Sequence, residues 1–414
     1  MSALPRNRER LLLFTLAAVQ FTHIMDFMIM MPLGPQFMRS FGISPTQFGF
    51  LVSIYSFAAG LLGFAAGFFM DKLDRKRALL FFYGGFVVGT LCCALSPNFF
   101  ALLLARTVAG AFGGVAASIV YAIVGDVIPY ERRGAAMGVI MTSFSLASIL
   151  GLPVGLMLTG WFSWHAPFLL LVGIGIVLLV AMNRILPALP PHRHATAHDA
   201  WAQMRTILTS PNHQRAFALI AVLAAGSALI YPYLTPSMVT NAKLPESLMW
   251  LIYALGGGAT LLTSPYFGGL ADRHGKLKIF TWLVLISAVP TVVIANMVPS
   301  PVWVILLVTT SYMVSTSGRF VPAMAMITAS VEPRYRGGFM SVNSAIQQLA
   351  AGLATSAAAL LVNSDAQGRI TGYPRAGWLA LIMIVASVWL IRHLRVAEPT
   401  TTSTPPAVEP AEVV

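Results

Sequence analysis

Charged side chains are scarce in this sequence. Only 10% of its 414 residues are Asp, Glu, Lys or Arg, whereas a soluble domain carries roughly 25%. Hydrophobic residues make up 57% of the chain and occur in long runs. This composition excludes an ordinary soluble domain and predicts a polytopic membrane protein.

Cysteines and enzyme signatures are also nearly absent. Cys92 and Cys93 are adjacent in an apolar stretch, which indicates packing rather than a disulfide framework or a metal site. No Gly-rich nucleotide loop, Ser/His/Asp set or metal cluster is recognisable. His192, His194 and His198 lack a second ligand cluster, so a solvated linker is favoured over a metal site. We therefore expect neither an enzyme nor a metal or organic cofactor.

Twelve apolar runs are long enough to cross a bilayer, which takes roughly 20 residues. They cover residues 11–35, 47–70, 78–95, 98–125, 135–160, 166–186, 216–238, 247–270, 279–297, 302–330, 338–362 and 376–396. The basic N-terminus MSALPRNRER lacks a small-residue cleavage site, and the run after it is longer than the apolar core of a signal peptide. The expected fold is therefore an all-α membrane protein of twelve transmembrane helices, the first of them retained.

The basic residues lie mainly on one side of these spans. With both termini cytoplasmic, 20 of the 26 Lys and Arg residues fall in cytoplasmic segments, four lie outside, and Arg106 and Arg319 lie within spans. The positive-inside rule therefore predicts a multi-pass protein of the cell (inner) membrane with both termini cytoplasmic. Because the basic residues are dispersed over seven segments, the net charge of +12 does not indicate nucleic-acid binding.

The longest polar segment divides the chain into halves. We expect an N-terminal six-helix bundle (1–186), a cytoplasmic linker (187–215), a C-terminal six-helix bundle (216–396) and a disordered Pro- and Thr-rich cytoplasmic tail (397–414).

Two loop sequences of the first half recur in the second. Asp71 in GFFMDKLDRKR and Asp272 in GGLADRHGK are 201 residues apart. Arg133 in PYERRGAAMG and Arg336 in PRYRGGFMS are 203 residues apart. Two pairs with nearly the same offset predict pseudo-symmetric halves, as in many secondary transporters.

At these loops the chain resembles the major facilitator superfamily, over essentially its whole length. The signature loop of that family is Gly-x-x-x-Asp-Arg/Lys-x-Gly-Arg/Lys-Arg/Lys. The first copy here matches it at Gly67, Asp71, Lys72, Arg75 and Lys76, with Asp74 in place of the second glycine. The second copy keeps the pattern at Gly268, Asp272, Arg273, Gly275 and Lys276.

The resemblance implies that these loops form a conformational latch, together with Arg133 and Arg336. In the family the first loop lies beside span eleven, which begins here near Gly338. The free backbone N–H groups at a helix start attract a carboxylate. Asp71 is therefore expected to hold the inner gate shut in the outward-facing state.

Two further motifs resemble those of exporters in the same family. ARTVAGAFGG (105–114) is similar to the proton-linked motif Arg-x-x-x-Gly of span four. GLPVG (151–155) is similar to a shortened antiporter motif of span five, Gly-Pro-x-x-Gly-Gly, through Gly151, Pro153 and Gly155. The resemblance implies an antiporter that exchanges a drug or metabolite for protons.

Asp26 is the only one of the fourteen acidic residues that lies deep in a span. Such residues are costly in the bilayer and usually face a cavity or a partner. At 1.5 Å per residue, Asp26 and Arg106 both lie roughly 12 to 14 Å below the outer surface. The resemblance packs spans one and four together, which would let them pair. We interpret the pair as a proton-coupling site rather than a static pair. His23 is a candidate relay in that site, but a packed histidine with satisfied hydrogen bonds is favoured for it.

Arg319 and several uncharged residues are candidates for the substrate cavity. Arg319 could bind an anionic group of the substrate, close the inner gate, or extend toward the inner surface. The other candidates are Tyr55, Tyr121, Tyr231, Tyr233, Asn343 and Gln347.

The predicted function is a proton-coupled secondary active transporter that exports small organic molecules by alternating access. Protons are the coupling ion, the partners are a small-molecule substrate and the lipid bilayer, and the chain is expected to be a monomer. A proton symporter that imports a metabolite would use the same carboxylate. A transceptor that senses a ligand without moving it would need no coupled proton, which argues against that class.

Overall fold

The computed structural model describes residues 6–69, 73–128, 132–187, 197–332 and 335–395. Within these residues, twelve helical segments are long and apolar enough to cross a membrane. The prediction of an all-α protein with twelve transmembrane helices is confirmed.

The first half contains six spans. Their bounds are α1 (Arg6–Ile29), α3 (Pro45–Phe69), α4 (Arg75–Ala94), α5 (Phe99–Val127), a fifth span made of α6 (Arg133–Leu146), the π-helix η3 (Ala147–Gly151) and α7 (Leu152–Trp161), and α8 (His165–Ile185). A short helix, α2 (Gly34–Phe41), follows α1 and ends at Gly42 in the left-handed conformation.

The second half repeats this order. Its bounds are α10 (Pro211–Ala228) continued by α11 (Tyr231–Thr240), the 3-10 helix η4 (Glu246–Leu248), α12 (Met249–His274), α13 (Lys276–Ala295), α14 (Val302–Ala329), α15 (Arg336–Leu361) and α16 (Tyr373–Arg392). A two-stranded hairpin of β1 (Asn363–Ser364) and β2 (Ile370–Thr371) joins the last two spans.

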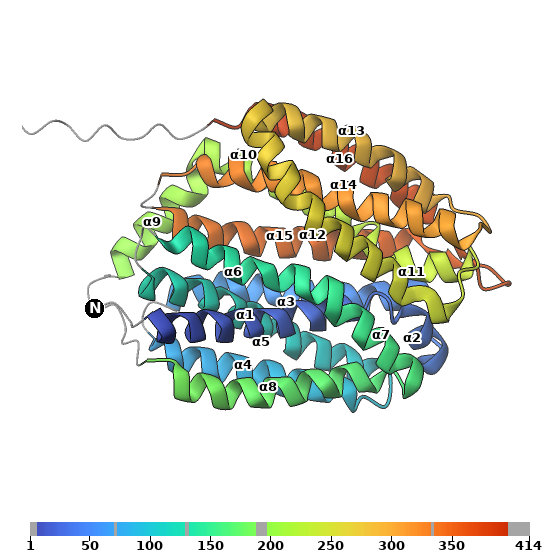
Figure 1. The fold of residues 1–414 in the computed structure, drawn as a ribbon, viewed down its shortest axis with the longest axis horizontal. Coiled ribbons are helices and arrows are strands. Elements are labelled where there is room, and N and C mark those ends of the chain that lie inside the picture. Colours follow the sequence, from blue (N-terminus) through green and yellow to red (C-terminus); the bar gives the residue numbers. More distant parts are fainter. Residues whose placement is uncertain (1–5, 70–72, 129–131, 188–196, 333–334, 396–414) are drawn as a thin grey trace, which may run out of the picture.

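The spans lie side by side and define two ends of the molecule (Figure 1). We call the end with the N-terminus and the helix α9 (Ala197–Thr209) the terminal end, and the end with α2, α7 and α11 the distal end. The halves meet mainly where α3 packs on α15, the fifth span on α12, and α2 on α11, and α5 and α3 also contact α15 and β1, respectively.

Hydrophobic packing joins the halves at the distal end. One cluster of buried residues contains Phe37 and Phe48 from the first half together with Tyr233 and Tyr373 from the second. Two other clusters draw their buried residues from a single half each. The distal end is therefore closed in this conformation.

The linker between the halves contains a helix that its composition did not predict. Met204 and Ile207 of α9 are buried in the cluster of the second half. A Cβ atom at Gly338 would lie 2.9 Å from Cδ1 of Ile207, so α9 packs closely against the start of α15. His192 and His194 lie outside the described residues.

Candidate functional site

Asp26 and Arg106 form an ion pair in the interior of the first half. Nη1 of Arg106 lies 2.7 Å from Oδ2 of Asp26, and both side chains have no exposed surface. The same nitrogen donates to the backbone oxygen of Asp26 at 3.3 Å. Thr90 donates to the second carboxylate oxygen at 3.2 Å. The pair therefore ties together α1, α4 and α5, and the two residues meet as their matching depth indicated.

Tyr55 of α3 completes the surroundings of the guanidinium. The ring centre lies 4.2 Å from Cζ of Arg106, in the geometry of a cation–π contact. A Cβ atom at Gly110 would overlap the backbone oxygen of Tyr55. This explains the Arg-x-x-x-Gly spacing, because the glycine admits the residue that packs on the arginine. Tyr55 thus belongs to the ion-pair cluster and has no exposed surface.

His23 lies one helical turn before Asp26, among aromatic rings. Its ring centre is 6.0 Å from that of Tyr55 and 5.9 Å from that of Phe86. Gly113 leaves the space that the imidazole fills, since a Cβ atom there would lie 2.7 Å from Cδ2 of His23. Both ring nitrogens are buried without a hydrogen-bond partner among the described residues. His23 is packed, but its polar atoms are not satisfied.

Unpaired polar atoms gather around the ion pair. Nε and Nη2 of Arg106, the hydroxyl of Tyr55 and the His23 nitrogens are all buried without a partner in the described part of the chain. Most buried polar groups in proteins are paired, and exceptions are concentrated at functional sites. The free Arg106 N–H groups can only donate a hydrogen bond, whereas an unpaired His23 nitrogen or the Tyr55 oxygen can accept one.

The antiporter-like motif packs directly against the helix that holds Asp26. A Cβ atom at Gly151 would lie 3.0 Å from Sδ of Met25, and one at Gly155 would lie 2.8 Å from Cδ1 of Ile29. The π-helix η3 ends at Gly151, and Pro153 cannot donate a backbone hydrogen bond to the preceding turn. The motif marks a break in the fifth span beside the acidic site.

The same break also faces the second half. A Cβ atom at Gly257 of α12 would lie 3.1 Å from the backbone of Ser148 in η3. The fifth span therefore touches both the helix with the ion pair and the opposite half.

The first signature loop is described only in part. Asp74 caps α4 by accepting a hydrogen bond from the backbone N–H of Arg77 at 2.9 Å. Arg75 pairs with Asp126 at 3.2 Å, and Lys76 donates to the backbone oxygen of Asn183 at 2.7 Å. These bonds join α4 to the ends of α5 and α8. Asp71 and Lys72 lie outside the described residues, and Gly67 lies in the last turn of α3.

The second copy shows why the two loops differ. Gly275 has φ of 92°, which favours glycine, and it stands where the repeat offset places Asp74, whose φ is −61°. The first copy therefore does not need the second glycine. Asp272 and Arg273 are exposed at the end of α12, and Arg133 and Arg336 begin α6 and α15.

Arg319 of α14 is the second fully buried arginine. Nη1 donates to Oγ of Ser287 at 3.0 Å and Nη2 donates to Oγ of Ser227 at 3.2 Å. Ion pairs between described residues link Arg39 with Glu246, Arg75 with Asp126, Arg106 with Asp26, and Arg132 with Glu9, and none includes Arg319. Its Nε has no hydrogen-bond partner among these residues. Because the guanidinium is turned inward onto α10 and α13, the side chain does not extend toward a surface.

The remaining cavity candidates do not form one cluster. Tyr233 is buried at the closed distal end, where its hydroxyl donates to the backbone oxygen of Pro45 at 2.8 Å. Tyr121 accepts a hydrogen bond from Gln20 at 3.3 Å. Tyr231 and Gln347 are half-buried. Asn343 is buried, and its side-chain oxygen has no hydrogen-bond partner among the described residues. Their roles as substrate contacts stay predictions.

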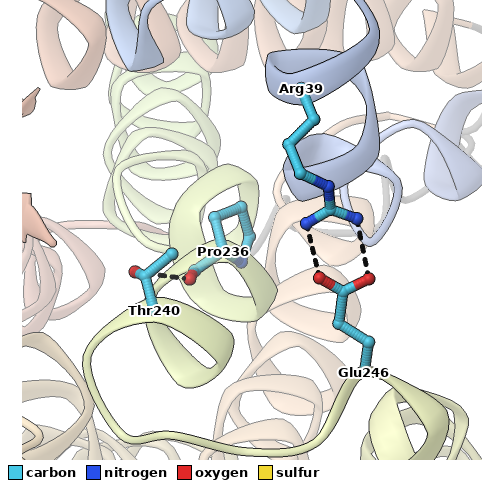
Figure 2. Close-up of polar contacts among 4 residues, drawn as sticks. All are labelled: Arg39, Pro236, Thr240 and Glu246. Carbon is cyan, nitrogen blue, oxygen red and sulfur yellow. Dashed lines mark hydrogen bonds and ion pairs between the residues drawn. The ribbon is translucent and has the colours of Figure 1, made fainter. Parts of the chain in front are cut away.

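An ion pair bridges the halves at the distal end. Arg39 of α2 makes two parallel bonds to the carboxylate of Glu246, the second of them at 2.8 Å (Figure 2). Nearby, the hydroxyl of Thr46 donates to the backbone oxygen of Val362 at 3.3 Å. Thr240, also drawn in Figure 2, donates to Pro236 within α11 at 2.9 Å. Nothing in the sequence predicted the Arg39–Glu246 pair, because the two residues lie in short helices between spans of separate halves.

Twelve spans in two repeated halves, with a buried ion pair inside one half, define the class of secondary membrane transporters. A sequence model of the Major Facilitator Superfamily matches residues 16–261 and 216–413. The chain belongs to this family, so the resemblance inferred from the motifs is confirmed.

Relatives of known sequence are transporters of the same family. The chain is 24% identical over 360 residues to the uncharacterized MFS-type transporter YceJ of Bacillus subtilis, covering 86% of this chain and 90% of YceJ. It is 25% identical over 248 residues to a protein of Helicobacter acinonychis named "Probable sugar efflux transporter". That alignment spans 60% of this chain and 62% of the relative.

Solved structures show the same fold. A bacterial homolog of the human lysosomal transporter Spinster, in an inward-facing and unoccupied conformation, matches with a TM-score of 0.72 at 14% identity, over 94% of this chain and 97% of that chain. A variant of the nucleoside transporter NupG matches with a TM-score of 0.71 at 12% identity, over 92% of this chain and 99% of that one.

Proposed function

We propose that the chain is a proton-coupled transporter that exports small organic molecules by alternating access, rather than an enzyme. The observation that supports this most directly is the fully buried pair of Asp26 and Arg106. A buried ion pair is a poor means of stabilisation compared with apolar packing, so its presence favours a functional role. Asp26 is also the only acidic residue placed deep in a span by the sequence.

Protonation of Asp26 supplies the coupling step. Burial favours the protonated form of a carboxylic acid, and a neighbouring guanidinium favours the ionised form, so a change in either can load or release a proton. When Oδ2 accepts a proton, the ionic bond to Nη1 of Arg106 is lost. Arg106 then keeps its contact with the Tyr55 ring and has free N–H groups. Return of Asp26 to the ionised form restores the pair and releases the proton.

The state of the pair reaches the other half through the fifth span. Met25 and Ile29 flank Asp26 on α1 and pack against Gly151 and Gly155. The π-helix before this motif packs in turn against Gly257 of α12. Once the ionic bond is lost, a shift of α1 relative to α5 would therefore displace the fifth span and change its contact with α12 at the interface between the halves.

The orientation follows from the positive-inside rule. With both termini cytoplasmic, the terminal end faces the cytoplasm and the closed distal end faces outside. Arg39, Glu246, Tyr233 and Pro45 then form an outer gate that must separate for substrate release. We place the protein as a monomer in the cell (inner) membrane, with protons as the coupling ion and without a cofactor.

Export is favoured over import by two features. The Arg106–Gly110 spacing and the glycines of residues 151–155 resemble motifs of exporters, and both lie at the acidic site. One relative, from Helicobacter acinonychis, is named as a probable sugar efflux transporter.

The test uses inverted membrane vesicles energised by a pH gradient. A panel of small organic compounds is added, and collapse of the gradient is recorded with a pH-sensitive dye. Wild type should dissipate the gradient with at least one compound, and Asp26→Asn should not. The control Asp365→Asn changes a half-buried carboxylate in the hairpin, keeps an oxygen for the backbone N–H groups of Gln367 and Arg369, and should behave as wild type. If Asp26→Asn still exchanges the compound for protons, the proposed coupling site is wrong.

A further inference from the structure

Arg319 is a buried cation without a counter-charge among the described residues. An arginine carries five N–H donors and stays charged in proteins. Among the described residues, two acceptors contact this side chain, the hydroxyls of Ser227 and Ser287. Burying an unpaired charge is costly, and this side chain has no exposed surface. The missing partner is therefore expected to be an anion that arrives from outside the protein.

The groups around Arg319 also point to a ligand. Tyr312, Thr316 and Arg319 are four and three residues apart, so they share one face of α14. Among the described residues, Nε of Arg319 has no hydrogen-bond partner, and the buried hydroxyls of Tyr312 and Thr316 have none except each other. This face of α14 therefore presents one charged N–H group and two hydroxyl groups that can bind oxygen atoms of a ligand.

The first span of the second half is broken beside this face. α10 ends at Ala228 and α11 begins at Tyr231, so Ser227 and Tyr231 lie on opposite sides of the break. Tyr231 is close enough to Arg319 to interact with it electrostatically. The start of α11 adds the positive end of a helix dipole, which favours an anion in the same place.

The chemistry of the site selects the type of anion. A single guanidinium balances one negative charge, and its planar N–H groups match the two oxygens of a carboxylate. The rings of Tyr231 and Tyr312 lie 5.4 Å apart and offer an aromatic surface next to the charge. We propose that Arg319 binds the carboxylate of a small aromatic monocarboxylic acid, which is the substrate class of the transporter. This inference rests on the proposed function, since it treats the ligand as the transported molecule.

The test measures binding of benzoate to the purified protein in detergent, with benzamide as its neutral counterpart. At millimolar concentrations benzoate should raise the melting temperature of wild type, and benzamide should not. Arg319→Gln should weaken benzoate binding by roughly 10- to 100-fold, because a hydrogen-bonded charge is lost. Arg369→Gln, in the exposed hairpin, is the matched control and should bind as wild type.

Arg319→Lys keeps the charge but loses the planar pair of donors. It should bind benzoate more weakly than wild type and more tightly than Arg319→Gln. If Arg319→Gln does not fold, this variant decides the question, since unchanged affinity would overturn the role of the guanidinium.

Four results would overturn the proposal. They are the absence of any benzoate effect on wild type, an equal effect of benzamide, unchanged affinity in Arg319→Gln, and equally strong stabilisation by chloride or sulfate that also depends on Arg319. The last would indicate a general anion site.

Binding in detergent needs no proton gradient, so the inference and the proposed function can fail separately. If benzoate binds but no compound collapses the gradient in vesicles, coupling fails and the site stands. If the gradient collapses with neutral compounds only, coupling stands and the carboxylate site fails.

Discussion

Each half has one arginine that is fully buried among its described residues, and the two halves compensate its charge differently. In the first half Arg106 on the fourth span pairs with Asp26 on the first, which also accepts a hydrogen bond from Thr90 on the third. In the second half Arg319 on the fourth span meets Ser227 on the first and Ser287 on the third. Asp26 and Ser227 are 201 residues apart, the same offset that separates the two signature loops.

From this comparison we infer that the repeated halves have different roles, proton binding in the first and ligand binding in the second. Where the first half supplies a carboxylate, the second supplies a hydroxyl at the equivalent position. The first half can therefore bind and release a proton within its own ion pair, whereas the second can only be neutralised by a ligand. The arginines themselves are not equivalent, because the repeat offset places Thr309 opposite Arg106.

The largest effect is expected from Asp26→Asn. Asn has nearly the same size and keeps an oxygen for Thr90, but it cannot cycle between charged and neutral forms. Accumulation driven by a pH gradient should fall to the background of vesicles without the transporter, while exchange down a substrate gradient persists. Proton release on substrate addition, measured in detergent, checks the cause. Release at the wild-type level would shift the assignment to His23.

Stability should respond differently to loss of the two arginines. Arg106→Gln leaves the Asp26 carboxylate buried without its cation, a change that typically costs about 3–5 kcal/mol. Arg319→Gln leaves only two serine hydroxyls behind, so its melting temperature should fall much less or even rise.

The double variant Asp26→Asn, Arg106→Gln is the internal control for this comparison. It removes both charges and should recover most of the loss seen in Arg106→Gln. Melting temperatures of the four proteins in one detergent would contradict the comparison if the two arginine variants were equally destabilised.

Ser227→Asp would make the second half resemble the first. The new carboxylate lies where Oγ of Ser227 already contacts Nη2 of Arg319, so the two should form an ion pair. Benzoate binding should be lost by at least about tenfold, because the anion then competes with an internal carboxylate. Ser227→Asn has a similar size without the charge and should retain binding. Equal loss in both variants would indicate a steric effect instead.

The long elements were predictable from the sequence, and the breaks within them were not. All twelve spans were identified as apolar runs of bilayer length, because a helix needs about 20 apolar residues to cross the hydrocarbon core. The π-helix before Pro153 and the interruption after Ala228 were missed, since both continue the apolar pattern. The helix α9 was hidden in a polar linker, where only Met204 and Ile207 are buried among its described side chains.

The same distinction holds for the site. Asp26 and Arg106 stood out because charges are rare in spans, and equal depth was enough to bring them together. Thr90, Ser227 and Ser287 gave no such signal, because hydroxyl residues in helices commonly bond to their own backbone, as Thr107 does with Leu103 at 2.8 Å. The position of Tyr55 under Arg106 depended on how closely α3 approaches Gly110, which the sequence alone does not specify.

The smallest effect on transport is expected at the distal end. Here the prediction concerns the ion pair that joins the two halves, not a difference between them. Arg39 and Glu246 are partly exposed, so their ion pair contributes only about 0.2–1 kcal/mol to the closed state. Glu246→Gln should therefore raise the population of the distal-open state by a few-fold at most, without abolishing transport.

Labelling of a cysteine introduced in place of Ser237, which is buried in α11 at the closed end, reports the opening. The charge reversal Arg39→Glu, Glu246→Arg restores an attractive pair and should return labelling to the wild-type rate. If labelling is unchanged by Glu246→Gln, packing around Phe48 and Tyr233 alone keeps the distal end shut, and the halves are joined there without help from charge.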